Sequence, residues 1–369
     1  MGKQPLTYEA AGVDYRRVDA LKVLAQQAAR ATAHNAAGQG MSEFGESRGE
    51  SAYVFEVGGL ILASITECLG TKSLVADAMR AITARTHYDT IAQDTVATAV
   101  NDLVTVGATP LAVHAYWAAG DSAWHDDAER TRDLVQGWKA ACDRCGAVWG
   151  GGETPALSGL VQAGRIDLAA SAIGIVRSRD RLTLGANLAA GDAIVLLESS
   201  GIHANGVSLA RKLAEQLPEG YRARLGDGRL FGEAVLDATL LYPPVTERVF
   251  EAGIRPKYAV NVTGHGWRKL MRHPGSFTYR VRQVPPVPPV LAFLQREAGM
   301  SARDAYGAFN MGAGFALFVA PADAERTVSA AAQAGVRAWV AGSVEAGPKR
   351  VIIEPLGVEY GAEDLHLRD

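Results

Sequence analysis

Four polar residues within positions 90–106 recur at helical spacing and could together hold a divalent cation. They are Asp94, Thr98, Asn101 and Asp102. Their spacing of i, i+4, i+7 and i+8 places two carboxylates and an amide on one helix face. Hard cations such as Mg²⁺ take oxygen ligands, usually one or two carboxylates with substrate phosphates and water. The same spacing fits an ordinary solvated helix face, so both interpretations stay open.

Two glutamates and a lysine stand near glycines at the ends of expected strands. Glu67 lies in ITECLGTK and Glu153 in WGGGETP. Such positions let a phosphate approach backbone N–H groups while a carboxylate reaches a metal ion. Lys72 could neutralise a transferred phosphoryl group. Strand-end glycines are more often simple turns, and the sequence has neither a Walker-type phosphate loop nor a GxGxxG fingerprint.

Histidines and cysteines offer weaker candidates. His203, in SSGIHANG, could act as a general base or bind a phosphate, and an ordinary loop histidine explains it equally well. Asn261 and His265, in NVTGHGW, have the same status. Cys142 and Cys145 form one CxxC in a helical pattern with no second pair at zinc spacing, which favours a structural role.

The elements that must position these residues alternate between strands and helices in the first half of the chain. Apolar runs at 57–66 and 166–176 predict buried strands, and periodic spacing predicts helices over 90–106 and 126–145. The polar, glycine-punctuated segment 177–192 is typical of an interdomain connection. We therefore place a domain boundary near residue 178, which gives domains over residues 1–178 and 179–369.

Composition excludes several classes of protein. The 369 residues are 48% hydrophobic and 21% charged, as in globular chains. Lys and Arg (37) nearly balance Asp and Glu (40), so no basic excess favours nucleic acid. No apolar run approaches the roughly 18 residues that span a bilayer, and the opening ten residues lack a hydrophobic signal core. We expect a cytoplasmic protein that binds neither membrane nor nucleic acid.

A series of motifs in order along the chain resembles the aminoimidazole ribonucleotide synthetase family, also called phosphoribosylformylglycinamidine cyclo-ligases. The likeness is collinear over nearly the whole chain. NDL and GGET are shared with other ATP-using relatives, whereas YEAAGVD and SSGIHANGVSL point to the cyclo-ligase branch. The motifs are YEAAGVD (8–14), LGTK (69–72), HYDTIAQD (87–94), NDLVTVGATPL (101–111), GGETPALSG (151–159), SSGIHANGVSLARK (199–212), TGHGW (263–267) and YGAFNMGAG (306–314).

The resemblance implies an α/β plus α+β fold. The N-terminal domain would bind ATP and metal and pair its strands across a two-fold axis into a dimeric β-barrel. The C-terminal α+β domain would close the active cleft. The family's enzymes use ATP and Mg²⁺ to phosphorylate the formamide oxygen of formylglycinamidine ribonucleotide, after which an amidine nitrogen closes the imidazole ring. The partners implied are therefore a small-molecule substrate and a second copy of the chain.

The resemblance also implies roles for residues at matching positions. The metal ligands would be Glu67, Asp94, Asp102 and Glu153. The nucleotide would meet Gly70, Thr71, Lys72, Asn101, Gly151 and Gly152. The catalytic groups would be Lys72, His203, Asn261 and His265, with His203 facing the substrate.

The sequence departs from the family pattern at several of these positions. The family reads TDGVGTK where this chain has TECLGTK, so Glu67 replaces an aspartate and Cys68 a glycine. An expected glycine-rich phosphate loop is replaced by GQGMSEFGESRGE, and Asn261 and His265 stand where the family has histidine and glycine. These departures leave open a paralogue with another acceptor, or a non-catalytic scaffold that binds a nucleotide.

Overall fold

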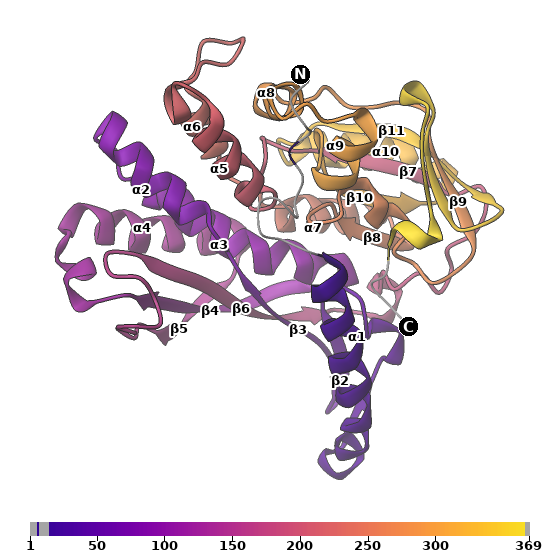
Figure 1. Ribbon diagram of the computed structural model, residues 1–369. Helices are drawn as coiled ribbons and strands as arrows, with labels where there is room; N and C mark the ends of the chain where they lie inside the picture. Colours follow the sequence, from indigo (N-terminus) through magenta and orange to yellow (C-terminus); the bar gives the residue numbers. More distant parts are fainter. Residues whose placement is uncertain (1–5, 7–14, 366–369) are drawn as a thin grey trace.

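The computed structural model describes Leu6 and residues 15–365, so the YEAAGVD motif lies outside the described residues. Two separate sheets organise the chain, as Figure 1 shows. The strands of the first sheet lie between residues 41 and 176, and those of the second between residues 193 and 361. The expected boundary near residue 178 falls between the two sheets, and as a domain limit it stays a prediction.

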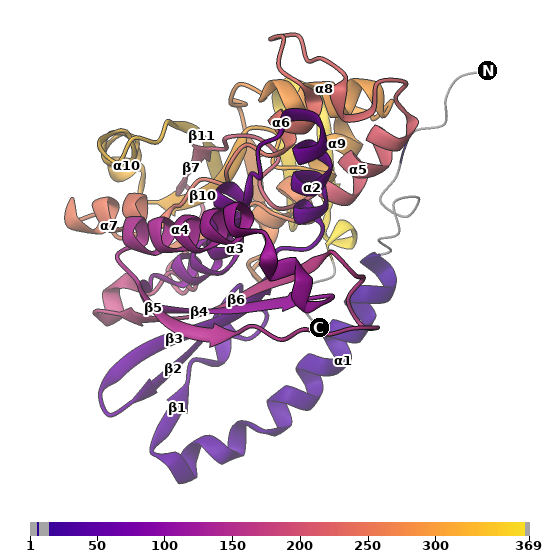
Figure 2. The ribbon, with the colours of Figure 1, turned by 90° about the vertical axis from the view of Figure 1, so that its left-hand side faces the viewer.

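Six strands form the first sheet, which curls like half a barrel (Figure 2). Neighbouring strands are antiparallel except for the last two, which run parallel. The closed barrel expected from two copies stays a prediction. In sheet order the strands are β1 (Met41–Glu43), β2 (Tyr53–Val57), β3 (Leu60–Cys68), β6 (Ile166–Val176), β4 (Thr109–Ala119) and β5 (Val148–Glu153).

A glycine pair corrects the predicted strand over residues 57–66. Gly58 and Gly59 have φ angles of 57° and 79°, a region that glycine enters at little cost. Two central residues with positive φ form the tight hairpin turn that matches the twist of the flanking strands. The chain therefore reverses at residues 58–59, and β3 begins only afterwards. The strand predicted over 166–176 is confirmed.

Helices cover one face of this sheet and separate it from the second half of the chain. In Figure 1, α3 and α4 lie between the sheet and the C-terminal elements, whereas α1 lies on the other side of the sheet in Figure 2. Asp127 caps α4 by accepting the backbone N–H of Arg130 at 3.1 Å, so this helix starts two residues later than predicted. The helices are α1 (Tyr15–Ala31), α2 (Lys72–Thr83), α3 (Tyr88–Leu103) and α4 (Ala128–Cys145).

The helix predicted over residues 90–106 is confirmed, with earlier limits for its α-helical part. The last turn tightens into a 3₁₀ segment, Val104–Val106, and Gly107 ends it at a φ of 84°. A Cβ atom at Gly107 would collide with the backbone carbonyl of Arg181. Close approach of that loop therefore requires glycine here and fixes where the helix stops.

Seven strands form the second sheet. All neighbouring pairs are antiparallel except β9 and β12, which are parallel. In sheet order the strands are β13 (Val358–Gly361), β12 (Arg350–Ile353), β9 (Phe277–Val281), β11 (Ala338–Ala346), β7 (Ala193–Glu198), β10 (Ala313–Val319) and β8 (Tyr258–Asn261). The helices are α5 (Val207–Gln216), α6 (Phe231–Val235), α7 (Pro243–Glu251), α8 (Pro289–Glu297), α9 (Ala302–Ala308) and α10 (Ala324–Gln333).

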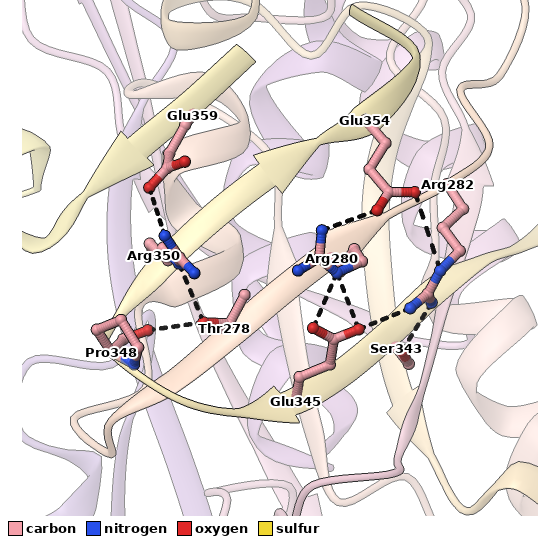
Figure 3. A network of polar contacts seen from close by, with 9 residues as sticks. All are labelled: Thr278, Arg280, Arg282, Ser343, Glu345, Pro348, Arg350, Glu354 and Glu359. Carbon is pink, nitrogen blue, oxygen red and sulfur yellow. Dashed lines mark hydrogen bonds and ion pairs between the residues drawn. The ribbon is translucent and has the colours of Figure 1, made fainter. Parts of the chain in front are cut away.

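Charged side chains of β9, β11 and the segments that follow β9 and β12 pair with one another (Figure 3). Arg280 contacts Glu345 and Glu354 at 2.8 Å, and Arg282 contacts Glu345 at 2.6 Å. These side chains are 24–49% exposed, so water screens each pair and its contribution to stability is small.

Within the part of the chain that is described, no helix has both the length and the apolar character needed to cross a bilayer.

Candidate active site

A cavity of about 560 Å³ opens where the two halves of the chain meet. The first half contributes the end of β3, the turn before α2 and one side of α3. The second half contributes the start of α5 and the loop leading into a 3₁₀ segment, Gly266–Met271. Among the sequence-predicted residues, the cavity is lined by Glu67, Gly70, Thr71, Thr98, Asp102 and His265.

Two carboxylates form the acidic centre of this cavity. The carboxylate of Glu67 has no hydrogen bond or ion pair with any described residue. Burial, followed by the charge of Asp102, raises its pKa to about 7. One oxygen of Asp102, Oδ1, accepts a hydrogen bond from the Asn261 amide at 2.7 Å, which leaves Oδ2 for another ligand. Two neighbouring carboxylates with free oxygens are the kind of donor set that Mg²⁺ prefers, so these residues fit the cation that the motif resemblance implies.

A buried lysine that sequence reasoning missed lies in the same cavity. Lys269 is 7% exposed, and its Nζ donates to Thr263 Oγ1 and, at 3.4 Å, to the backbone carbonyl of Asn261. Burial lowers its pKa to about 8, against the opposing influence of the nearby carboxylates. In the sequence, WRKLM resembles an ordinary surface-charged turn, and only its position after TGHGW points to the site.

The expected phosphate-binding lysine is committed to an internal ion pair. Lys72 Nζ lies 2.7 Å from Asp94 Oδ2, and neither side chain has any exposed surface. The same ammonium donates to the Asp237 carbonyl at 3.0 Å, and Asp94 Oδ1 accepts from the Thr239 backbone and hydroxyl at 2.7 and 2.5 Å. Neither residue lines the cavity. The expected placements of Lys72 at a phosphate and of Asp94 among the metal ligands therefore differ from those in the structure.

Asn101 continues this contact with the second half of the chain. Its side-chain amide donates to the Leu240 carbonyl at 2.8 Å and accepts from the Tyr242 N–H at 2.9 Å. Both polar atoms of its side chain therefore bind backbone of the second half, and its role toward a nucleotide stays a prediction. The polar stripe of α3 is buried, with Asn101 at 1% and Asp102 at 8% exposure, so the solvated-face interpretation is wrong.

His203 stands behind the cavity wall rather than facing a substrate. Its Nε2 accepts the backbone N–H of Ser200 at 3.2 Å, and the residue is 4% exposed. Burial, aided by the charge of Lys72, lowers its pKa to about 3, so the ring is neutral. His203 does not line the cavity, and its ring holds the loop whose next residues, 204–208, do; its role toward a substrate stays a prediction.

The other two predicted catalytic residues have different positions. His265 lines the cavity at a φ of 71°, a backbone region that glycine enters more readily than histidine. Asn261 is 4% exposed and does not line the cavity, and its side-chain amide donates to Asp102.

The glycine-rich motif at 151–153 lies elsewhere. Gly151, Gly152 and Glu153 are exposed on β5, the edge strand of the first sheet, and do not line the cavity. A Cβ atom at Gly152 would collide with the Ala115 backbone of β4, which explains this glycine by strand pairing. One chain therefore brings together Glu67 and Asp102 but neither Asp94 nor Glu153. Among the described residues, no three His, Cys, Asp or Glu side chains are grouped to hold a metal ion.

Two helix N-termini converge on the cavity. Thr71 precedes α2 and its Oγ1 lies 3.5 Å from Ser208 Oγ in the first turn of α5. Gly70 and Gly206, with φ angles of 74° and 89°, form the turns into these helices. Free N–H groups and the positive ends of helix dipoles favour an anion at such a position.

An arginine holds the loop that replaces the family's glycine-rich segment. Arg272 donates to the Gly49 carbonyl at 2.9 and 3.1 Å and to Ser51 Oγ at 2.8 Å. It also lies 3.5 Å from the Glu50 carboxylate, which accepts a hydrogen bond from Tyr258 at 2.9 Å. Residues 49–51 thus form a rim of the cavity that is tied to the second half of the chain.

The cysteines divide by exposure. Cys68 is exposed at the cavity, and partial desolvation of its thiol there, followed by the charge of Glu67, raises its pKa. Cys142 and Cys145 are buried in α4, where burial raises their pKa values to about 11 and 12. Protonated, buried thiols pack as small apolar groups, in agreement with the structural reading of this CxxC.

Comparisons with known proteins extend the motif resemblance. The family model described as AIR synthase related protein, N-terminal domain, matches residues 49–176, and its C-terminal counterpart matches residues 281–354. A phosphoribosylformylglycinamidine cyclo-ligase from Anaeromyxobacter dehalogenans is 33% identical, covering 93% of this chain and 96% of that protein. The same enzyme from Carboxydothermus hydrogenoformans is 31% identical, with coverages of 95% and 99%.

A solved structure supports the fold. AaThiL complexed with AMPPCP and TMP has a TM-score of 0.57 at 14% identity, covering 85% of this chain and 90% of that chain. The resemblance inferred from the motifs is thereby confirmed, and this chain belongs to the family of phosphoribosylformylglycinamidine cyclo-ligases.

Proposed function

We propose that this chain is an ATP-dependent cyclo-ligase that converts formylglycinamidine ribonucleotide to aminoimidazole ribonucleotide. Near full-length similarity to curated cyclo-ligases carries the proposal, together with a cavity lined by carboxylates and cations. The γ-phosphoryl group of ATP moves to the formamide oxygen, and ADP leaves. An amidine nitrogen then attacks the activated carbon, and inorganic phosphate departs with that oxygen as the ring closes.

Mg²⁺ would be held by Glu67 and Asp102, and when bound it would neutralise phosphate charge. Glu67 has no partner among the described residues, and Asp102 keeps one oxygen free because Asn261 takes the other. A relative of the same fold, solved with AMPPCP, supports nucleotide binding by this architecture.

The anionic parts of the substrates would meet the cavity's positive features. The N-termini of α2 and α5 present Thr71 and Ser208 toward one another, and Arg272 lines the same space. Backbone N–H groups and a guanidinium together suit a phosphate monoester. The 5′-phosphate of the ribonucleotide is the group we assign there.

We further propose a homodimer built on the curled sheet. Leu111 and Tyr116 of β4 and Val148 of β5 are 40%, 36% and 66% exposed, and β5 is a free sheet edge within one chain. Pairing with a second copy would cover these side chains and close the barrel. Light scattering at micromolar concentration should give twice the mass of 38.9 kDa, and a stable monomer would contradict the barrel.

A mass-spectrometric assay tests the reaction. Purified protein with ATP, Mg²⁺ and formylglycinamidine ribonucleotide should release ADP, phosphate and the cyclised ribonucleotide together. Asp102→Ala should lose turnover and the thermal shift given by Mg²⁺-ADP, whereas Arg282→Gln in the exposed network of Figure 3 should keep both. Turnover by Asp102→Ala at the wild-type rate would refute the assigned site.

The position of His265 supports a second candidate function, in which the chain is a paralogue that phosphorylates a different acceptor. Its imidazole lines the cavity where the family pattern has glycine, and a site that hydrogen-bonds one substrate rejects analogues that leave its groups unpaired. This candidate requires retained nucleotide binding without ring closure, and His265→Gly would then restore cyclisation. Wild-type turnover of roughly 1 to 10³ per second would exclude it.

A further inference from the structure

Lys269 is a buried ammonium that the proposed reaction does not yet use. It shares the cavity with Glu67 and Asp102, and the electrostatic influence among these groups is mutual. Its nitrogen donates to two neutral oxygens, so one of its three N–H groups has no partner in the described chain. It makes no ion pair within 4.0 Å of any described carboxylate, so both carboxylates stay available.

Asn261 connects this ammonium to the acidic centre. Its carbonyl accepts from Lys269 at 3.4 Å while its side-chain amide donates to Asp102 at 2.7 Å. One residue therefore sets the position of the cation relative to the carboxylate. Of the other cations at the cavity, Lys22 lies on the exposed side of α1, and Arg272 is engaged with the 49–51 loop.

We propose that Lys269 is a fixed counter-ion that makes the Glu67–Asp102 pair prefer a metal–nucleotide complex to the bare metal ion. The inference rests on the proposed function in one respect, namely that these two carboxylates hold the divalent cation. A bare divalent cation is repelled by the nearby ammonium. A metal–nucleotide complex carries net negative charge, so the same ammonium attracts it, and its unpartnered N–H can donate to a phosphate oxygen.

Opposite signs in two binding measurements test this proposal. Lys269→Met removes the charge and keeps an unbranched side chain. Free Mn²⁺, counted by electron paramagnetic resonance without nucleotide, should bind this variant about tenfold more tightly than the wild type. Mn²⁺-ADP, measured by calorimetry, should bind it about tenfold more weakly. A merely structural role for Lys269 would weaken both.

Three further variants separate the possible failures. Arg282→Gln removes a cation outside the cavity and should leave both affinities unchanged, while Lys269→Gln repeats the test should the methionine variant fail to fold. Asp102→Asn should weaken Mn²⁺ binding in every background. Loss of Mn²⁺ binding in Asp102→Asn without opposite shifts in either Lys269 variant overturns the counter-ion role and leaves the metal assignment standing. Unchanged Mn²⁺ binding in Asp102→Asn overturns both.

Discussion

Breaking the Lys72–Asp94 ion pair should destabilise the protein strongly. Both side chains are fully buried and their charged atoms lie 2.7 Å apart. Lys72→Met leaves a carboxylate without its counter-ion in a dry environment, which typically costs about 3–5 kcal/mol. Burial already raises the pKa of Asp94, so proton uptake limits the loss, and the hydrogen bonds from Thr239 persist. We therefore expect the lower end, about 3 kcal/mol.

A double-mutant cycle isolates the pair from other effects. Asp94→Asn removes the charge and keeps one acceptor for Thr239, so Lys72→Met combined with Asp94→Asn should cost less than the two single changes added. We expect a coupling of about 2 kcal/mol between residues in direct contact. The free energy of unfolding is measured in urea by circular dichroism, with tryptophan fluorescence as a second probe because two domains can unfold separately.

An exposed ion pair provides the matched control. Lys139 lies 2.6 Å from Asp143, and both side chains are 62% exposed. Lys139→Met should leave the unfolding midpoint unchanged within error, because solvent screens such pairs. If Lys72→Met shifted the midpoint no more than Lys139→Met, burial would not govern the cost of breaking the Lys72–Asp94 ion pair, and the prediction would be refuted.

Three other outcomes follow from the burial and packing of particular residues. First, His203 has its pKa lowered to about 3, so it stays neutral in the folded protein and takes up a proton only on unfolding. It should therefore make the free energy of unfolding fall by about 1.4 kcal/mol per pH unit as pH drops from 6.5 toward 3. In acid titrations, His203→Gln should flatten that slope. In the native protein, iodoacetamide should label Cys68 and spare Cys142 and Cys145, and mass spectrometry showing all three labelled equally would contradict their burial. Gly152→Ala should lower the melting temperature, because a Cβ there collides with β4, and an unchanged melting temperature would argue against the close strand pairing.

The sequence predicted the elements of the first half better than the positions of their side chains. Periodicity located α3, since an apolar stripe at steps of three and four is a local signal. Whether its opposite stripe met solvent, a metal or protein depended on residues 237–242, more than a hundred positions away. Local spacing carries no information on that partner. Two local signals correct the predicted limits: the paired glycines at 58–59 separate two strands, and the Asp127 cap sets the start of α4.

The motif resemblance located the cavity but not every role within it. The predicted residues that line it include Glu67, Gly70, Thr71 and Asp102. Each of these lies at or next to the end of a strand or helix that a local sequence pattern locates. The surroundings of Glu153 depend on what pairs with β5, because β5 is the edge strand of its sheet within one chain. Its proposed metal role therefore needs information on assembly, which neither spacing nor one chain provides.

Adjacent residues of α3 connect the contact between the two halves of the chain to the Glu67–Asp102 carboxylate pair. Asn101 holds the backbone of Leu240 and Tyr242, while Asp102, next in the chain, receives the Asn261 amide from β8. Both partners belong to the second half of the chain, so a change in its orientation cannot leave Asp102 unaffected. The helix that contacts both halves of the chain therefore also fixes the position of one carboxylate of the proposed metal site.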